Sequence, residues 1–256
     1  MCIRDRSQGQ DPPIHYFHRA DLPPGTVGQG MVQRGGPMRG YVQPVELHVP
    51  KGVRISVPTG GVFGPPEDGP VKLGMVLGDV YRIKITDVPQ HPGLEIFPSI
   101  EVVNRLYPPL GKEANFPVPI VFTLEELTLA LDNHYITRVI YLENPKLALP
   151  QAESPSDQRY FEVKRHEDPL QVADRFGRPM AIMRMGSRIP DVQQMNGQQF
   201  LFGAPNAQRY PKLAPQPEIR PGSARLPSEV HVIKHRQDYP RVQLQALPPI
   251  VPSQQR

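Results

Sequence analysis

The middle of the chain alternates apolar and polar residues in short stretches separated by glycine and proline. Side chains in a strand point alternately to opposite faces, so apolar residues at every second position indicate strands with one buried face. The apolar positions with this period are Tyr41, Val45, Leu47 and Val49; Val53, Ile55 and Val57; Val71, Leu73, Met75 and Leu77; and Tyr81, Ile83 and Ile85. The first two sets flank a Pro50-Lys51-Gly52 turn, which predicts a hairpin.

Three later segments differ from this simple alternation. Leu94 to Val103 contains Pro98, and Phe116 to Phe122 contains two prolines. Proline cannot donate to a neighbouring strand, so both segments are predicted to be edge or bulged strands. His134 to Glu143 has apolar residues on both faces, which predicts a central strand covered on both sides.

Helix signals are few but specific. Thr123 and Glu126 have the spacing of a capping box and predict a helix that ends near Asp132-Asn133. Asp168-Pro169 supplies an N-cap and a first helical residue for a second helix, which runs to Phe176 and is closed by Gly177. Short strands are predicted at Tyr160 to Val163 and at Pro179 to Met185.

These elements predict a mainly β fold, an antiparallel β-sandwich of the immunoglobulin-like kind with one or two short helices and long disordered termini. Tyr135, which opens a strand after a tight turn, loosely resembles the tyrosine corner of such sandwiches. The expected organisation is an artefactual start and a disordered Gly/Pro-rich arm at 1–39, and a β-sandwich core at 40–150. A short strand and helix extension packed on the core is expected at 151–185, and a disordered basic Gln/Pro-rich tail at 186–256. Within that tail, Val230 to Ile233 could form a short extended piece.

Composition supports long non-helical segments, since 34 of the 256 residues are proline. Met1 to Arg6 resembles the translated end of a library-preparation transposon, so these residues and Cys2, the chain's single cysteine, are left out of the functional interpretation. No apolar run is long enough to span a membrane. Gly186 to Arg256 holds 9 basic and 4 acidic residues, an excess too dilute to predict nucleic-acid binding.

The glycines between Gly28 and Gly36 raise the possibility of a phosphate loop. Gly30 and Gly35 have the first spacing of such a loop, but no lysine or hydroxyl residue follows them. A dinucleotide fingerprint fails as well, because Gln33 stands where its third glycine is required. Gly28 to Arg39 is therefore interpreted as a flexible arm.

No pattern of histidines or carboxylates predicts a catalytic centre. The eight histidines are scattered, and each carboxylate pair has a local explanation in a turn or at a helix start. Glu67 and Asp68, in a Pro-Pro-Glu-Asp-Gly turn, are the candidates for a surface calcium site. No cofactor is predicted, and whether the protein is an enzyme stays open, with a non-catalytic protein favoured. The histidines are His15, His18, His48, His91, His134, His166, His231 and His235.

The proline-punctuated strands, the capping-box helix before a tyrosine-led strand and the D-P-L-x-V-A-D-x-x-G-x-P segment from Asp168 to Pro179 resemble an uncharacterised group of exported bacterial proteins. The resemblance implies export to the periplasm or cell envelope and implies no reaction. We therefore expect a non-catalytic β-sandwich module that binds a protein or a surface polymer through exposed edges or arms.

The alternative is an enzyme-associated or carbohydrate-binding accessory domain. Its site would be built from the loops Gly60 to Pro70 and Pro108 to Phe116, with Tyr81, Tyr107 and Tyr135 as stacking residues. A pocket that joined two or more of five residues would favour such a site over a simple binding module. These residues are His48, His91, His134, Glu95 and Glu101.

Overall fold

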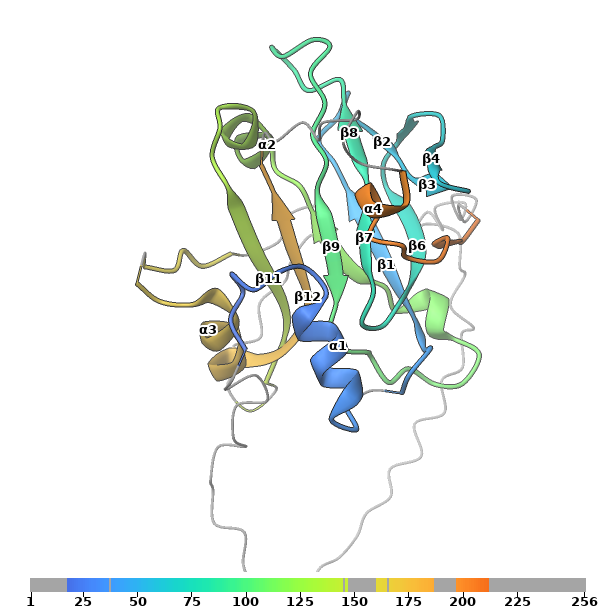
Figure 1. Ribbon diagram of the computed structural model, residues 1–256, viewed down its shortest axis with the longest axis vertical. Coiled ribbons are helices and arrows are strands. Elements are labelled where there is room, and N and C mark those ends of the chain that lie inside the picture. The colour runs from blue at the N-terminus through green and yellow to red at the C-terminus, as the bar shows by residue number, and fades with distance from the viewer. Residues whose placement is uncertain are drawn as a thin grey trace, which may run out of the picture. The chain divides into compact units, whose positions relative to one another are not determined.

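The computed structural model describes residues 18–36, 38–144, 146, 160–164, 166–186 and 197–211. Two four-stranded sheets form the core of the fold (Figure 1). The first has the order β10 (Val118–Val121), β1 (Val42–His48), β6 (Val71–Val76) and β13 (Gln208–Arg209). The second has the order β11 (Ile136–Glu143), β12 (Gly177–Met185), β9 (Ser99–Val102) and β7 (Val80–Arg82).

Smaller elements complete the described part of the chain. A three-stranded sheet has the order β5 (Glu67–Asp68), β2 (Arg54–Ser56) and β8 (Lys84–Thr86), and β3 (Pro58–Thr59) pairs with β4 (Val62–Phe63). The helices are α1 (Thr26–Gln33), the short 3-10 turn η1 (Glu113–Asn115), α2 (Leu124–Leu131), α3 (Pro169–Phe176) and α4 (Gly197–Phe200). The strand pairs are antiparallel except β1 with β10, which is parallel. The prediction of a mainly β, antiparallel sandwich is confirmed.

The main apolar core is built from the side chains that the alternating pattern predicted to be buried. Fully buried examples come from four of the predicted strands: Leu47, Ile55, Leu73 and Ile83. A second, smaller cluster lies on the opposite face of the second sheet, where α1 and α3 pack. Its members are Ala20, Val27, Val103, Leu170 and Ile182. The second sheet is therefore covered on both faces.

Both predicted helix starts are confirmed. The Thr123 hydroxyl accepts from the backbone N–H of Glu126, and the Glu126 carboxylate accepts from the backbone N–H of Thr123, which completes the capping box of α2. The Asp168 carboxylate accepts from the backbone N–H groups of Leu170 and Gln171, and α3 ends at Phe176 as predicted.

The predicted places of two strands are wrong. β11 was expected in the centre of a sheet, yet it forms the edge of the second sheet, and the central place belongs to β12. Every residue of β12 from Pro179 to Met185 is buried, because its two faces contact the two apolar clusters. The core therefore does not end at residue 150, because Gly177–Met185, expected to belong to an extension, supplies a central strand of the sheet.

Three local predictions are also wrong. The turn at Pro50 forms, but the strands on its two sides do not pair with each other. β1 pairs with β6 and β10, and β2 pairs with β5 and β8 in another sheet, so β1 and β2 form no hairpin. β9 begins after Pro98 and lies between β12 and β7, so it is not an edge strand. Tyr160 to Val163 forms no strand. By contrast, β10 does lie at an edge, as its prolines predicted.

The boundaries of the arm and the tail need correction. Thr26–Gln33 forms α1 and buries Val27, Gly28 and Met31, so the Gly-rich segment is ordered. Residues 197–211 contain α4 and β13, and the Phe200 ring packs against the rings of Phe63 and Phe97. Residues 1–17, 187–196 and 212–256, which include Val230 to Ile233, lie outside the described residues. None of the helices in the described ranges has the length and hydropathy needed to cross a bilayer.

Candidate binding groove

The five residues whose convergence would have indicated a catalytic pocket lie apart. His48 Nε2 is 3.1 Å from Glu46 Oε2, the Lys84 amino group is 3.0 Å from Glu95 Oε1, and Glu101 is fully buried. His91 lies in a turn after β8, and His134 is exposed before β11. None of the five lines the groove described below, and a smaller hollow beside Pro50 contains only His48 among them.

The other histidines do not gather either. His18 is buried beside α1, and His166 is exposed before α3. Burial, assisted by the positive charge of Arg34, lowers the pKa of His18 below its usual 6.5. His15, His231 and His235 lie outside the described residues.

The calcium candidates Glu67 and Asp68 occupy the two positions of β5. Glu67 forms an ion pair of 2.6 Å with Arg209, and Asp68 lies 3.7 Å from the Arg54 side chain. Neighbouring side chains in a strand point to opposite faces. Within the ranges that the structure describes, no group of three or more histidine, cysteine, aspartate or glutamate side chains is placed to hold a metal ion.

The Gly-rich segment has a packing role. A Cβ atom on Gly28 would lie 2.9 Å from the Cα of Gly78 and 3.2 Å from the carbonyl oxygen of Val102, so only glycine allows this approach. The backbone N–H of Gly28 donates to Glu101 Oε1 at 2.7 Å. The amide that a phosphate would require is therefore already used.

Glu101 and Arg184 form a buried ion pair that the sequence did not reveal. Arg184 Nη1 is 2.8 Å from Glu101 Oε2, and their side chains are 2% and 0% exposed. Arg184 Nε donates to the carbonyl oxygen of Ala20, and the N–H of Ala20 donates to Asp168. Together with the Gly28 contact, this network attaches the segment before and within α1 to the second sheet and α3.

The tyrosines proposed for sugar stacking have different surroundings. Tyr81 is buried, its hydroxyl accepts from the backbone N–H of Val76, and burial raises its pKa to about 12. Tyr135 is 69% exposed just before β11, so its resemblance to a tyrosine corner concerns sequence position alone. Tyr107 is exposed and stacks with arginine. Tyr81 is thus excluded as a stacking residue.

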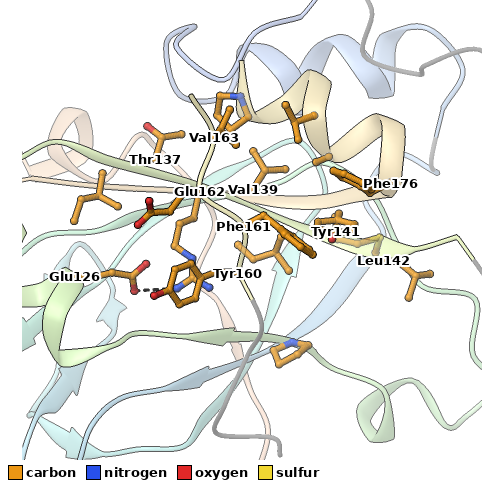
Figure 2. Close-up of a pocket in the computed structure, with 18 of the residues that line it drawn as sticks. Glu126, Thr137, Val139, Tyr141, Leu142, Tyr160, Phe161, Glu162, Val163 and Phe176 are labelled. Carbon is orange, nitrogen blue, oxygen red and sulfur yellow. Dashed lines mark hydrogen bonds and ion pairs between the residues drawn. The ribbon is translucent and has the colours of Figure 1, made fainter. Parts of the chain in front are cut away.

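A groove of about 920 Å³ lies where the edges of the two large sheets approach each other. Its walls come from all eight residues of β11, from β10 and α2, from α3, and from residues 160–164, which cross β11 (Figure 2). β10 and β11 are the edge strands of their sheets. The groove is therefore the open side of the sandwich.

Aromatic side chains form one wall of this groove. The Phe161 and Phe176 rings stack with centroids 5.7 Å apart at an interplanar angle of 16°, and the Tyr141 ring lies 6.4 Å from Phe176. Figure 2 shows these rings together, with Tyr160 on the same crossing segment. Tyr160, Phe161 and Phe176 each expose nearly half of their surface or more. Such a contiguous apolar patch is typical of an interaction surface.

The charged residues of the groove are mostly acidic. Arg138 Nη1 donates to Glu126 Oε2 at 3.0 Å and also to the carbonyl oxygen of Val121, which fastens α2 and β10 to β11. Glu167 is paired with Arg175. The lining contains five carboxylates, Glu125, Glu126, Glu143, Glu162 and Glu167, and two cations, Arg138 and Lys164. The groove thus joins apolar rings with an excess of negative charge.

Fold and groove define a β-sandwich protein with an acidic, aromatic groove at the open edge of its two main sheets. The lining of the groove, as far as the structure describes it, includes no histidine or cysteine. Comparison with protein-family models, with curated proteins and with solved structures finds no match. The groove was not foreseen from the sequence, because residues 160–164 and β11 are separated along the chain and only the fold brings them together.

Proposed function

We propose that this protein is a non-catalytic binding module of the bacterial cell envelope, and that its groove binds an extended, apolar and basic segment of a partner protein. The observation that carries the proposal is the combination of exposed rings and excess carboxylates in one groove. Apolar side chains of the partner would cover the rings, and its lysines or arginines would lie beside the carboxylates.

The length of the groove supports an extended ligand. All eight residues of β11 line it, and at about 3.3 Å per residue a strand of this length extends about 26 Å. An extended peptide of about eight residues would match that span. A compact ligand such as a single sugar ring would cover only a small part of it.

Charge supports a basic ligand. Glu125, Glu143 and Glu162 are exposed and form no ion pair within the described residues. Charges at the rim of an interface act on association rate and on the choice of partner more than on affinity itself. We therefore expect selectivity for basic over acidic segments, weakened by salt.

The proposal is tested with two octapeptides that carry the same fluorescent label at the N-terminus, one alternating valine with lysine and the other alternating valine with glutamate. Binding to the full chain is measured by fluorescence anisotropy at low salt. We expect the lysine peptide to bind at least tenfold more tightly. Equal binding of the two peptides, or tighter binding of the glutamate peptide, would overturn the proposal.

A matched pair of variants places the interaction in the groove. Glu162→Lys changes an exposed carboxylate of the crossing segment, and Asp132→Lys makes the same change on the end of α2, outside the lining. Only Glu162→Lys should weaken binding of the lysine peptide. An equal effect of both variants would indicate attraction to overall charge and would contradict binding in the groove.

Envelope localisation is a separate part of the proposal and is supported by the resemblance of the segment from Asp168 to Pro179. It is tested by recovering the complete 5′ end of the coding sequence. A signal peptide or lipobox is the expected result. A native start directly before Ser7, with neither signal, would contradict export.

A further inference from the structure

Two arginines and two tyrosines alternate at one end of the groove. The Arg105 guanidinium carbon lies 4.8 Å from the Tyr41 ring centroid and 4.4 Å from that of Tyr107. The Arg178 guanidinium carbon lies 5.2 Å from the same Tyr107 centroid. We call these four residues the ladder, and it places two positive charges beside one exposed ring.

The ladder adjoins the groove through two residues of the groove's lining. Leu106, between Arg105 and Tyr107 in the chain, lines the groove. Arg178 of β12 is in register with Leu142 of β11, which also lines it. A ligand that extends along β11 toward Leu142 therefore reaches the ladder.

Backbone contacts fix the position of the ladder. The N–H groups of Val103 and Asn104 both donate to the carbonyl oxygen of Met180, two residues after Arg178. The N–H of Leu106 donates to the side chain of Gln43, a fully buried residue of β1, at 2.7 Å. The two arginines are thus held by both large sheets, and a ligand would meet guanidinium groups that are already in place.

The charges of the ladder are available to a ligand. Among the residues that the structure describes, neither Arg105 nor Arg178 forms an ion pair. A guanidinium that contacts a ring through its flat face can still donate hydrogen bonds from its N–H groups in its own plane. These N–H groups match the two oxygens of a carboxylate.

We infer that the ladder binds a carboxylate of the segment that occupies the groove, either its terminal carboxylate or an aspartate or glutamate side chain. The inference rests on the proposed function and adds a direction to it. The basic, apolar part of the ligand lies along β11, and its carboxylate lies at Arg105 and Arg178. The ladder would thereby fix which way the segment lies.

Three forms of the valine-lysine octapeptide test this inference by fluorescence anisotropy on the full chain. One has a free terminal carboxylate, one is amidated, and one is amidated with aspartate at its last position. We expect the two carboxylate-bearing forms to bind about tenfold more tightly than the plain amide, which corresponds to about 1.4 kcal/mol. The last two forms separate a side-chain carboxylate from a terminal one.

Variants assign the effect to the ladder. In Arg178→Gln the preference for the carboxylate should fall below about twofold, and Arg178→Lys should retain part of it because the charge stays while the planar fork is lost. Arg54→Gln, on β2, is the matched control and should keep the full preference. If the three peptides bind the unmodified chain equally, the inference is wrong while the proposed function stands.

A direct measurement keeps the two ideas distinguishable. If none of the peptides binds, the proposed function fails. The ladder is then tested alone by titrating the full chain with acetate and following the NMR signals of the arginine Nε–H groups. Shifts confined to Arg105 and Arg178 and lost in Arg178→Gln would support a carboxylate site. The absence of such shifts would overturn it.

Discussion

The buried ion pair between Glu101 and Arg184 gives the most decisive test of how the N-terminal segment is held. Replacing Arg184 with methionine introduces an unbranched apolar side chain and leaves the Glu101 carboxylate buried without its cation. Removing one partner of a buried pair typically costs about 3–5 kcal/mol. The free energy of unfolding of a native protein is typically about 5–15 kcal/mol, so Arg184→Met should remove a large fraction of it.

A double replacement separates the ion pair from general packing effects. Glu101→Gln leaves Arg184 buried without a carboxylate and should also be strongly destabilising, whereas Glu101→Gln combined with Arg184→Met leaves no buried charge. We therefore expect the double variant to lose less stability than the sum of the two single variants, by at least about 2 kcal/mol. The amide oxygen introduced by Glu101→Gln can still accept from the Gly28 N–H, so that contact is kept in both variants that carry it.

Urea unfolding followed by circular dichroism measures the free energies, and hydrogen exchange at the Gly28 amide reports on the attachment of α1. Arg175→Met is the matched control, because Arg175 is 64% exposed in its pair with Glu167, and it should change stability by less than about 1 kcal/mol. A loss below about 1 kcal/mol in Arg184→Met, or additive effects in the double variant, would refute the reasoning.

Three further predictions concern the same fold. Because burial lowers the pKa of His18, its imidazole binds a proton more readily in the unfolded chain than in the folded chain. Stability that is present above pH 6.5 should therefore be lost as the pH falls below that value. His18→Gln should flatten this part of the plot of urea midpoint against pH, and an unchanged plot would contradict the assignment. Gly28→Ala should lower the free energy of unfolding in urea by about 1–3 kcal/mol. The close backbone contacts of Gly28 with Gly78 and Val102 outweigh the gain of about 1 kcal/mol in helix propensity. A more stable variant would show that the segment can shift. Thr123→Ala should cost about 1 kcal/mol by removing the cap of α2, with Thr59→Ala, at an exposed position, as an unaffected control.

Local chemistry explains which parts of the fold were predictable. The caps at Thr123 and Asp168 depend on hydrogen bonds within three residues, so the sequence contains the complete motif. The buried positions of the early strands depend only on alternation within each segment, and Val53 and Ile55 are buried as predicted. Pairing is different, since no local signal states that β1 joins β10 and β6 rather than β2.

The Gly-rich segment shows a second limit. Its glycines predicted freedom, because glycine most often serves turns and flexible loops. In the fold, Gly28 serves close approach to Gly78 and Val102, which come from distant parts of the chain. Glu101 is likewise fully buried, and its burial depends on Arg184, which is 83 residues away. Neither contact could be inferred from the local sequence, because each joins residues that are far apart in the chain.

The position of β11 at the edge of its sheet also explains why a groove exists. A strand that is apolar on both faces was expected in the centre of a sheet, because a central place covers both sets of side chains. β11 instead lies at an edge, where Ile140 is buried in the core, Val139 packs against the second cluster, and Tyr141 and Leu142 line the groove. The apolar surface that a neighbouring strand would have covered is left to α3, to the rings of residues 160–164 and, in our proposal, to a ligand. The conflict between an interior pattern and an edge position thus indicates the binding surface.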